Sequence, residues 1–193
     1  MLVTDDALLA GRDLVGLCAA AARGGITSVE LRLKHAAPRD LLACARDLIA
    51  ALSIPVLVND RLDVALAAGA AGVHLGSDDL PVELARRVAP RGFIIGASVA
   101  DAVEAGRGMG ADYWGVGPWR ASDTKPAAGP PLGEDGFRGI ARLAGAIPCL
   151  AIGGVRPEDV ALVRECGGAG VAVASGILGD QDVEGAARRY AIG

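Results

Sequence analysis

The chain has few aromatic side chains, few histidines and no long apolar run. Aromatic residues make up 3% of its 193 residues, and there are 2 histidines. Every apolar stretch is short and is interrupted by Gly, Asp or Arg, so none is fit to span a membrane. No secretory signal peptide is recognisable. These absences predict a soluble, cytoplasmic protein.

The chain also lacks a basic stripe and paired cysteines. Its 19 Lys and Arg are outnumbered by 23 Asp and Glu, for a net charge of −4, so we expect no nucleic-acid partner. The negative net charge still allows an anionic small-molecule substrate, because positively charged side chains at a binding site can outweigh the charge of the whole protein there. The cysteines form no C-x-x-C motif, and Cys18, Cys44 and Cys149 lie in apolar patterns that predict small core residues. Whether the chain forms a homo-oligomer is left open.

The composition favours a folded α/β protein. Hydrophobic residues reach 52% and the chain has 28 glycines, while charged residues stay at 22%, a balance that argues against disorder. A core of Ala, Val, Leu and Ile suits buried parallel strands that pack closely on Ala-rich helices. The length suits one domain, residues 1–193.

Short β-branched runs alternate with longer Ala/Leu/Arg segments. The expected strands are Leu2–Thr4, Ser28–Leu33, Pro55–Asn59, Gly72–Leu75, Phe93–Ser98, Tyr113–Val116, Cys149–Ile152 and Gly170–Ala174. The expected helices include Arg12–Arg23, Pro38–Leu52, Ala100–Gly106 and Val183–Tyr190, with others beginning near Pro81 and Pro157 and a short one after the strand Pro55–Asn59. Eight strand-then-helix units predict a single (β/α)8 TIM barrel. A doubly wound open sheet is the alternative, but no Gly-rich fingerprint follows the first strand.

Charged side chains follow the expected strands at the end where this fold places active sites. Asp60 and Asp79 come from neighbouring strand ends, and Arg32, Lys34 and Lys125 add positive charge at the same face. Together with Asn59, these residues predict a Mg²⁺ and polyphosphate site, since Mg²⁺ takes one or two carboxylates and completes its shell with substrate oxygens. The cations would neutralise the remaining phosphate charge.

A second anion site is predicted after strands seven and eight. The turns Gly153-Gly154 and Ser175-Gly176 stand where this fold commonly holds a phosphate with backbone N–H groups. A long loop rich in Pro, Ala and Gly, residues 117–133, is expected to have a functional role.

Structural explanations compete with these assignments. Asp60 could cap the following helix, and one of Asp78 and Asp79 could cap the helix near Pro81. Lys125 could be a solvated loop residue. For His74, a satisfied core histidine is favoured over catalysis.

Several segments in chain order carry a resemblance to a known family. They are LVTDD, ELRLK, VLVNDRLDVALAAGAAGVHLGSDDLP, IIGAS, GADYWGVGPWRASDTK, AIGGV and GVAVASGI. The chain resembles thiamine phosphate synthase along nearly its whole length. The resemblance implies a Mg²⁺-dependent transferase of thiamine biosynthesis. Such an enzyme joins hydroxymethylpyrimidine diphosphate to hydroxyethylthiazole phosphate and releases pyrophosphate by a dissociative substitution.

The resemblance also implies a role for each matching position. Asp60 and Asp79 would hold Mg²⁺. The diphosphate would be bound by Arg32, Lys34, Asn59, Ser98, Thr124 and Lys125, of which Arg32, Ser98 and Lys125 are the expected catalytic residues. Ser122 and Thr124 would reach the thiazole phosphate, and Gly154, Ala174 and Ser175 would bind it through their backbone.

The chain departs from the family pattern at four positions. Glu30 stands where Gln is usual, and could accept a hydrogen bond from the pyrimidine amine. Arg120 replaces an aromatic residue, Ala100 replaces the histidine of a Ser-x-His motif, and Ser122 replaces Thr. Two alternatives stay open: a thiazole tautomerase-like isomerase without Mg²⁺, and a catalytically silent paralogue that binds phosphate ligands.

Overall fold

The computed structural model describes residues 1–121 and 129–191, and within them eight strands form one parallel sheet in chain order. The strands are β1 (Leu2–Val3), β2 (Val29–Leu31), β3 (Val56–Asn59), β4 (Gly72–Leu75), β5 (Ile94–Val99), β6 (Tyr113–Val116), β7 (Cys149–Ile152) and β8 (Gly170–Ala172). Parallel strands in chain order, with helices between them, define the (β/α)8 barrel. The predicted fold class is confirmed, and the predicted strands differ from the observed ones by at most a few residues at their ends.

Ten helices lie in the described part of the chain. They are α1 (Asp6–Leu9), α2 (Leu14–Arg23), α3 (Pro38–Ala51), α4 (Leu62–Ala68), α5 (Val82–Val88), α6 (Ala102–Arg107), α7 (Gly133–Ala144), α8 (Asp159–Glu165), α9 (Ser175–Leu178) and α10 (Val183–Ala191). No range was predicted for helices α1, α7 and α9. Of these, α1 and α9 are four residues long, and so short a segment carries no helical periodicity. None of the described helices is long and apolar enough to cross a membrane.

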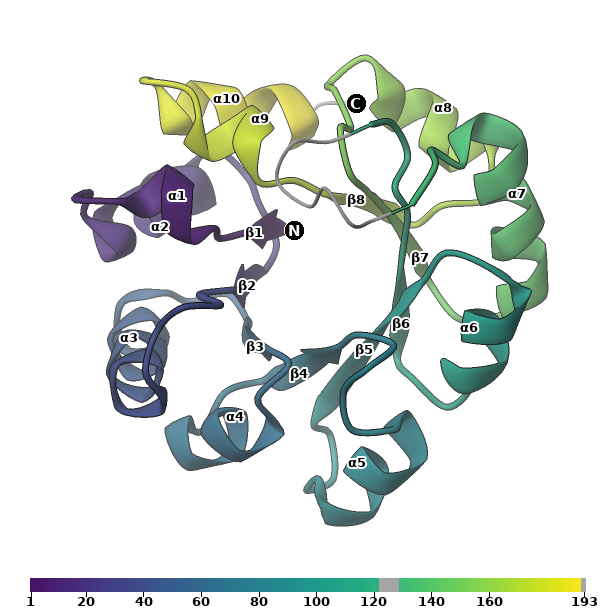
Figure 1. The fold of residues 1–193 in the computed structure, drawn as a ribbon. Helices are drawn as coiled ribbons and strands as arrows, with labels where there is room; N and C mark the ends of the chain where they lie inside the picture. Colours follow the sequence, from purple (N-terminus) through teal and green to yellow (C-terminus); the bar gives the residue numbers. More distant parts are fainter. Residues whose placement is uncertain (122–128, 192–193) are drawn as a thin grey trace. The chain divides into compact units, whose positions relative to one another are not determined.

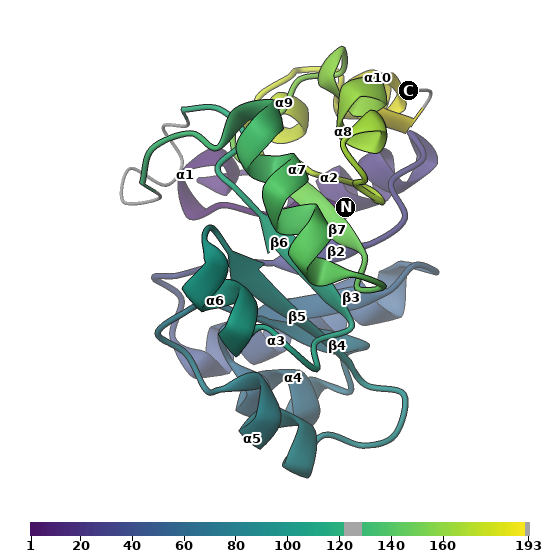
Figure 2. The same ribbon diagram turned by 90° about the vertical axis from the view of Figure 1, so that its right-hand side faces the viewer.

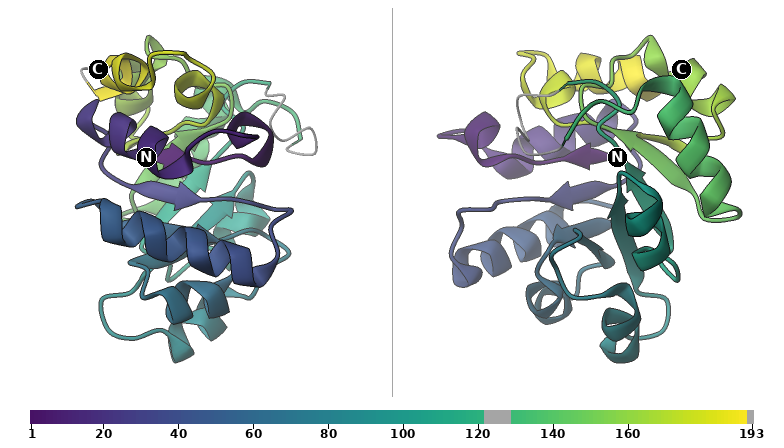
Figure 3. Two further views of the ribbon diagram at one scale, coloured as in Figure 1. Left: turned by 90° about the vertical axis from the view of Figure 1, so that its left-hand side faces the viewer. Right: turned by 45° about the vertical axis from the view of Figure 1, so that its right-hand side comes forward.

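The chain comprises two compact units, and the first contains Met1–His74 with the segment that begins at Ala174. In this unit α3 and α4 lie side by side and both contact β3 (Figure 1). Helix α10 packs on α2, as the left view of Figure 3 shows in yellow and purple. Small buried residues, Cys18 and Ala21 on α2 and Ala186 and Ala187 on α10, permit this close helix packing.

The second unit, Leu75–Val173, contains β5–β8 and α5–α8. Helix α7 contacts β6 and β7 and lies along them in Figure 2. Two of the chain's few aromatic side chains, Trp114 and Phe137, are fully buried here. The Trp114 Nε1–H donates to the Gly108 carbonyl at 2.9 Å, so the indole is both packed and hydrogen-bonded. The prediction that residues 1–193 form one domain stays a prediction.

The cysteines are free thiols, and the core assignment holds for two of the three predicted. Cys18 and Cys149 are buried, and Cys44 is only half-buried. Burial, with the nearby Asp13 charge, raises the pKa of Cys18 to about 12. Burial raises the pKa of Cys149 to about 11. Both thiols therefore stay protonated and unreactive at neutral pH.

Candidate active site

Lys34 and Asp60 meet beyond the ends of β2 and β3 in the first unit. The Lys34 Nζ lies 3.6 Å from the Asp60 Oδ2, with side chains 44% and 30% exposed. The structure thus brings together a lysine that is predicted to bind phosphate and a carboxylate that is predicted to bind the metal ion. Because both side chains reach solvent, the pair is weak and both groups can turn to a ligand.

Asp60 has an unusual backbone. Among the described residues it is the only non-glycine with a positive φ, 63°, and its N–H donates to the His74 carbonyl at 2.7 Å. Such conformations concentrate at functional sites. Asp60 does not cap α4, whose N-cap is Arg61 and which has no side-chain cap hydrogen bond. The competing capping role for Asp60 is therefore wrong.

Arg32 is held by the segment that follows β1. Its Nη1 donates to the Asp5 Oδ2 at 2.9 Å, and the two side chains are 17% and 13% exposed. The Thr4 Oγ1 accepts from the Arg32 N–H at 2.7 Å and donates to the Arg32 carbonyl at 3.1 Å. Asp6 accepts a hydrogen bond from the Lys34 N–H at 2.8 Å. Thr4, Asp5 and Asp6 therefore position two predicted phosphate-binding residues.

Three further residues of the first unit lie at or near these strand ends. Glu30, in β2, is 3% exposed, so its carboxylate is withdrawn from bulk water. Asn59 ends β3 and is half-buried, and its register partner on β4 is His74. His74 is 6% exposed, which agrees with the core role favoured from the sequence.

The remaining predicted residues of the first unit lie where β8 gives way to α9. Ala174 is the N-cap of α9, and its carbonyl accepts from the N–H groups of Ile177 and Leu178. Ser175 opens the helix and is exposed. Strand β8 ends at Ala172, two residues earlier than predicted, because the chain turns there into a helix that the sequence did not reveal.

In the second unit, Asp79 closes the turn that follows β4. Its Oδ2 accepts a hydrogen bond from the Gly76 N–H at 2.7 Å, while Asp78 is exposed. Neither caps α5, whose N-cap is Pro81 and which has no side-chain cap hydrogen bond. Ser98 lies within β5 and is half-buried.

The Gly153–Gly154 turn after β7 is enclosed by the chain that follows β6. Gly154 has φ 64°, and a Cβ added there would lie 2.8 Å from the Ala121 carbonyl oxygen and 2.9 Å from the Arg120 Cβ. Only glycine fits both the conformation and the space. Among the residues that the structure describes, none accepts a hydrogen bond from the Gly154 N–H. The predicted residues Ser122, Thr124 and Lys125 lie outside the described residues.

Comparison with known proteins identifies the family. The profile described as "Thiamine monophosphate synthase" matches residues 1–177. The chain belongs to this family. It is 43% identical over 193 residues to the thiamine-phosphate synthase of Syntrophomonas wolfei, covering 97% of this chain and 92% of the relative. It is 45% identical over 192 residues to that of Methanoculleus marisnigri, covering 97% and 90%.

A solved structure of the same family agrees with the fold. The thiamine phosphate pyrophosphorylase from Pyrococcus furiosus is 34% identical and superposes with a TM-score of 0.86. The match covers 98% of this chain and 91% of that one. This thiamine monophosphate synthase family member therefore shares both sequence and fold with named relatives.

Sequence reasoning also missed an ion pair between Arg120 and the buried Asp159 in this family member. Arg120 donates to both carboxylate oxygens of Asp159, through Nη2 to Oδ1 and through Nε to Oδ2 at 3.1 Å. Burial acts to raise the pKa of Asp159, but hydrogen bonds from Arg120 and from the Arg156 N–H lower it on balance. The only clue in the sequence was that Arg120 departs from the family pattern. Its partner could not be found from the sequence, because Asp159 lies 39 residues further along the chain.

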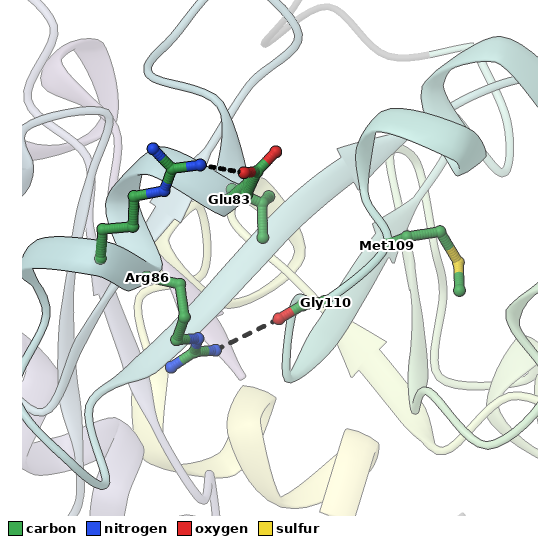
Figure 4. A pocket seen from close by; sticks show the side chains of 6 residues that line it. Glu83, Arg86, Met109 and Gly110 are labelled. Carbon is green, nitrogen blue, oxygen red and sulfur yellow. Dashed lines mark hydrogen bonds and ion pairs between the residues drawn. The ribbon is translucent and has the colours of Figure 1, made fainter.

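A hollow of about 330 Å³ lies elsewhere in the second unit, on α5 and the turn before β6 (Figure 4). It is lined by Val82, Glu83, Arg86, Arg87, Met109 and Gly110. The Arg86 Nη2 donates to the Gly110 carbonyl at 3.3 Å along its wall. None of the predicted site residues lines this hollow, so the candidate site rests on the strand ends.

Proposed function

We propose that this chain is a thiamine phosphate synthase that joins hydroxymethylpyrimidine diphosphate to hydroxyethylthiazole phosphate. The observation that carries the proposal is the 43–45% identity to named thiamine-phosphate synthases over nearly the full length of both chains. The C–O bond between the pyrimidine methylene and the diphosphate breaks, and pyrophosphate leaves with the electron pair. The thiazole nitrogen lone pair then forms the new C–N bond, which leaves a thiazolium product.

The chain's own part in this reaction is electrostatic. Charge develops on the departing pyrophosphate, so fixed cations lower the barrier without a protein nucleophile. We assign this task to Arg32, Lys34 and Lys125, with Asn59, Ser98 and Thr124 as hydrogen-bonding partners of the diphosphate. The pairing of Arg32 with Asp5 at 2.9 Å supports its part, because an anchored guanidinium pays little ordering entropy on binding.

The thiazole phosphate and the pyrimidine need separate contacts. We assign the phosphate to the backbone of Gly154, Ala174 and Ser175, with the Ser122 hydroxyl, because backbone N–H groups bind phosphate and glycine allows close approach. Glu30 would accept a hydrogen bond from the pyrimidine amine. Its 3% exposure supports this role, because a withdrawn carboxylate gains most from a donor in a poorly hydrated site.

We assign Asp60 and Asp79 to a Mg²⁺ ion of the kind that diphosphate substrates bring. The described residues contain no group of three or more His, Cys, Asp or Glu that could hold a metal ion. Mg²⁺ needs only one or two protein carboxylates when water and phosphate oxygens complete its shell. The Asp60 carboxylate is 30% exposed, within reach of such a ligand. When bound, Mg²⁺ would supply positive charge that stabilises the leaving pyrophosphate.

The proposal also includes the cellular location of the protein and its partners. A biosynthetic family and small phosphorylated substrates suit the cytoplasm, and a net charge of −4 argues against nucleic acid as a partner. Gel filtration would determine whether the chain is a homo-oligomer.

The direct test is turnover. Purified protein is incubated with both substrates and Mg²⁺, with and without chelator, and thiamine phosphate is quantified by oxidation to its fluorescent product. We expect Mg²⁺-dependent product in the wild type, strong loss in Asp60→Asn, and retention in Asp78→Asn, a matched control that removes an exposed carboxylate with no assigned role. Chelator-independent isomerisation of a thiazole carboxylate phosphate would instead favour the tautomerase. Tight thiazole phosphate binding without any product would favour the silent paralogue.

A further inference from the structure

Residues 117–121, the segment that follows β6, are joined to the end of β7 by backbone hydrogen bonds. The Trp119 N–H donates to the Ile152 carbonyl at 2.7 Å, and the Arg120 N–H donates to the Gly153 carbonyl at 2.9 Å. The absence of a side chain at Gly154 leaves the room that Ala121 and Arg120 occupy. The position of the Gly154 backbone therefore depends on segment 117–121 staying in place.

The Arg120–Asp159 ion pair ties the same segment to α8. The Arg120 side chain is 46% exposed, whereas the Asp159 side chain is 3% exposed. The Asp159 Oδ2 also accepts a hydrogen bond from the Arg156 N–H at 2.9 Å. One carboxylate therefore holds both sides of the Gly153–Gly154 turn: the backbone two residues after Gly154, and the segment that packs against it.

We propose that Arg120 and Asp159 are positioning residues that hold segment 117–121 against the Gly153–Gly154 turn and so set the Gly154 N–H for a phosphate monoester. The inference rests on the proposed function, which makes that ligand hydroxyethylthiazole phosphate. Neither side chain is assigned a contact with substrate. Their effect passes through the backbone, and it extends the site to a pair of residues that the family resemblance did not supply.

The chemistry of the pair explains why these two residue types are needed together. The planar guanidinium matches both carboxylate oxygens with two parallel N–H donors, which a lysine ammonium cannot do. Asp159 is buried, so removing Arg120 leaves a carboxylate with less compensation in a poorly hydrated place. Segment 117–121 or the Gly153–Gly154 turn would then shift to admit water. A displacement of about 1 Å at a group that contacts the ligand is enough to weaken its interaction with that ligand many-fold.

The test compares Arg120→Leu, Arg120→Lys and Asp159→Asn with the matched control Arg142→Leu, which removes an exposed arginine from α7 of the same unit. The control isolates the loss of one positive charge. We expect Arg120→Leu and Asp159→Asn to raise the KM for hydroxyethylthiazole phosphate about tenfold, the equivalent of 1.4 kcal/mol. The KM for the pyrimidine diphosphate should stay within about twofold. Arg120→Lys should behave like Arg120→Leu, because the lysine ammonium keeps the charge but cannot offer two parallel N–H donors to the carboxylate. Arg142→Leu should match the wild type.

A second readout is independent of turnover. Amide hydrogen exchange at residues 119 and 120 should quicken in Arg120→Leu, because their N–H groups lose protection when the segment detaches, and should not change in Arg142→Leu. Unchanged exchange at these two amides would overturn the positioning role. So would equal rises in both KM values, or full rescue by lysine. If the wild type forms no thiamine phosphate, the proposed function fails, and the exchange result still decides whether the pair holds the segment.

Discussion

Substituting Gly154 by alanine is the sharpest probe of the site, because the structure says what the added methyl group would meet. The new Cβ would lie 2.8 Å from the Ala121 carbonyl oxygen and 2.9 Å from the Arg120 Cβ. The φ of 64° adds a conformational penalty for any residue with a Cβ. The turn or segment 117–121 must move, and the Gly154 N–H moves with it.

The matched control is Gly69→Ala at the end of α4. Gly69 has φ 72°, and a Cβ there meets nothing within 4 Å. Its cost is the left-handed conformation alone, about 1–2 kcal/mol. Gly154→Ala should lose about 1–3 kcal/mol more through the steric clash. For a chain of this size the additional loss lowers the Tm by at least about 2 °C relative to Gly69→Ala.

The assays are calorimetry for the Tm and steady-state kinetics for each substrate. We expect Gly154→Ala to raise the KM for hydroxyethylthiazole phosphate by about tenfold or more and to leave the pyrimidine diphosphate KM nearly unchanged. Gly69→Ala should lower the Tm with no change in either KM. Equal Tm values for the two variants would refute the packing argument, and an unchanged thiazole phosphate KM in Gly154→Ala would refute the phosphate site.

Three further predictions concern the ion pairs and the thiols. Lys34→Ala should change the free energy of unfolding by less than about 1 kcal/mol, because the pair with Asp60 is exposed, yet weaken diphosphate binding; a large drop in Tm by calorimetry would contradict this. The lowered pKa of Asp159 contributes stability above its unfolded value of about 3.9, and this contribution is lost as pH falls through the folded pKa. The Tm of the wild type should therefore fall more steeply than that of Asp159→Asn as pH is lowered below about 4, and parallel curves would count against the pair. Cys18 and Cys149, with pKa values of about 12 and about 11, should resist a thiol reagent such as Ellman's in the native protein and react in denaturant; rapid native labelling of either would show that it is not buried.

Much of the architecture follows from local pattern. β4, β6 and β7 have the residues predicted for them, since short apolar runs bounded by turn residues mark buried strands. The ends of other elements were decided by capping. Helix α2 begins at Leu14 rather than Arg12, because the Asp13 side chain accepts from the Gly16 N–H.

The sequence by itself determined the order of eight strands and most of their helices, and it named the residue types at the strand ends. Periodicity and composition suffice for this, because each strand or helix depends mainly on neighbours along the chain. Tertiary structure alone decided which charges meet. Arg32 finds Asp5 across 27 residues, and Arg120 finds Asp159 across 39. Segments so far apart meet only when parallel strands align their ends, so no local pattern could have paired them.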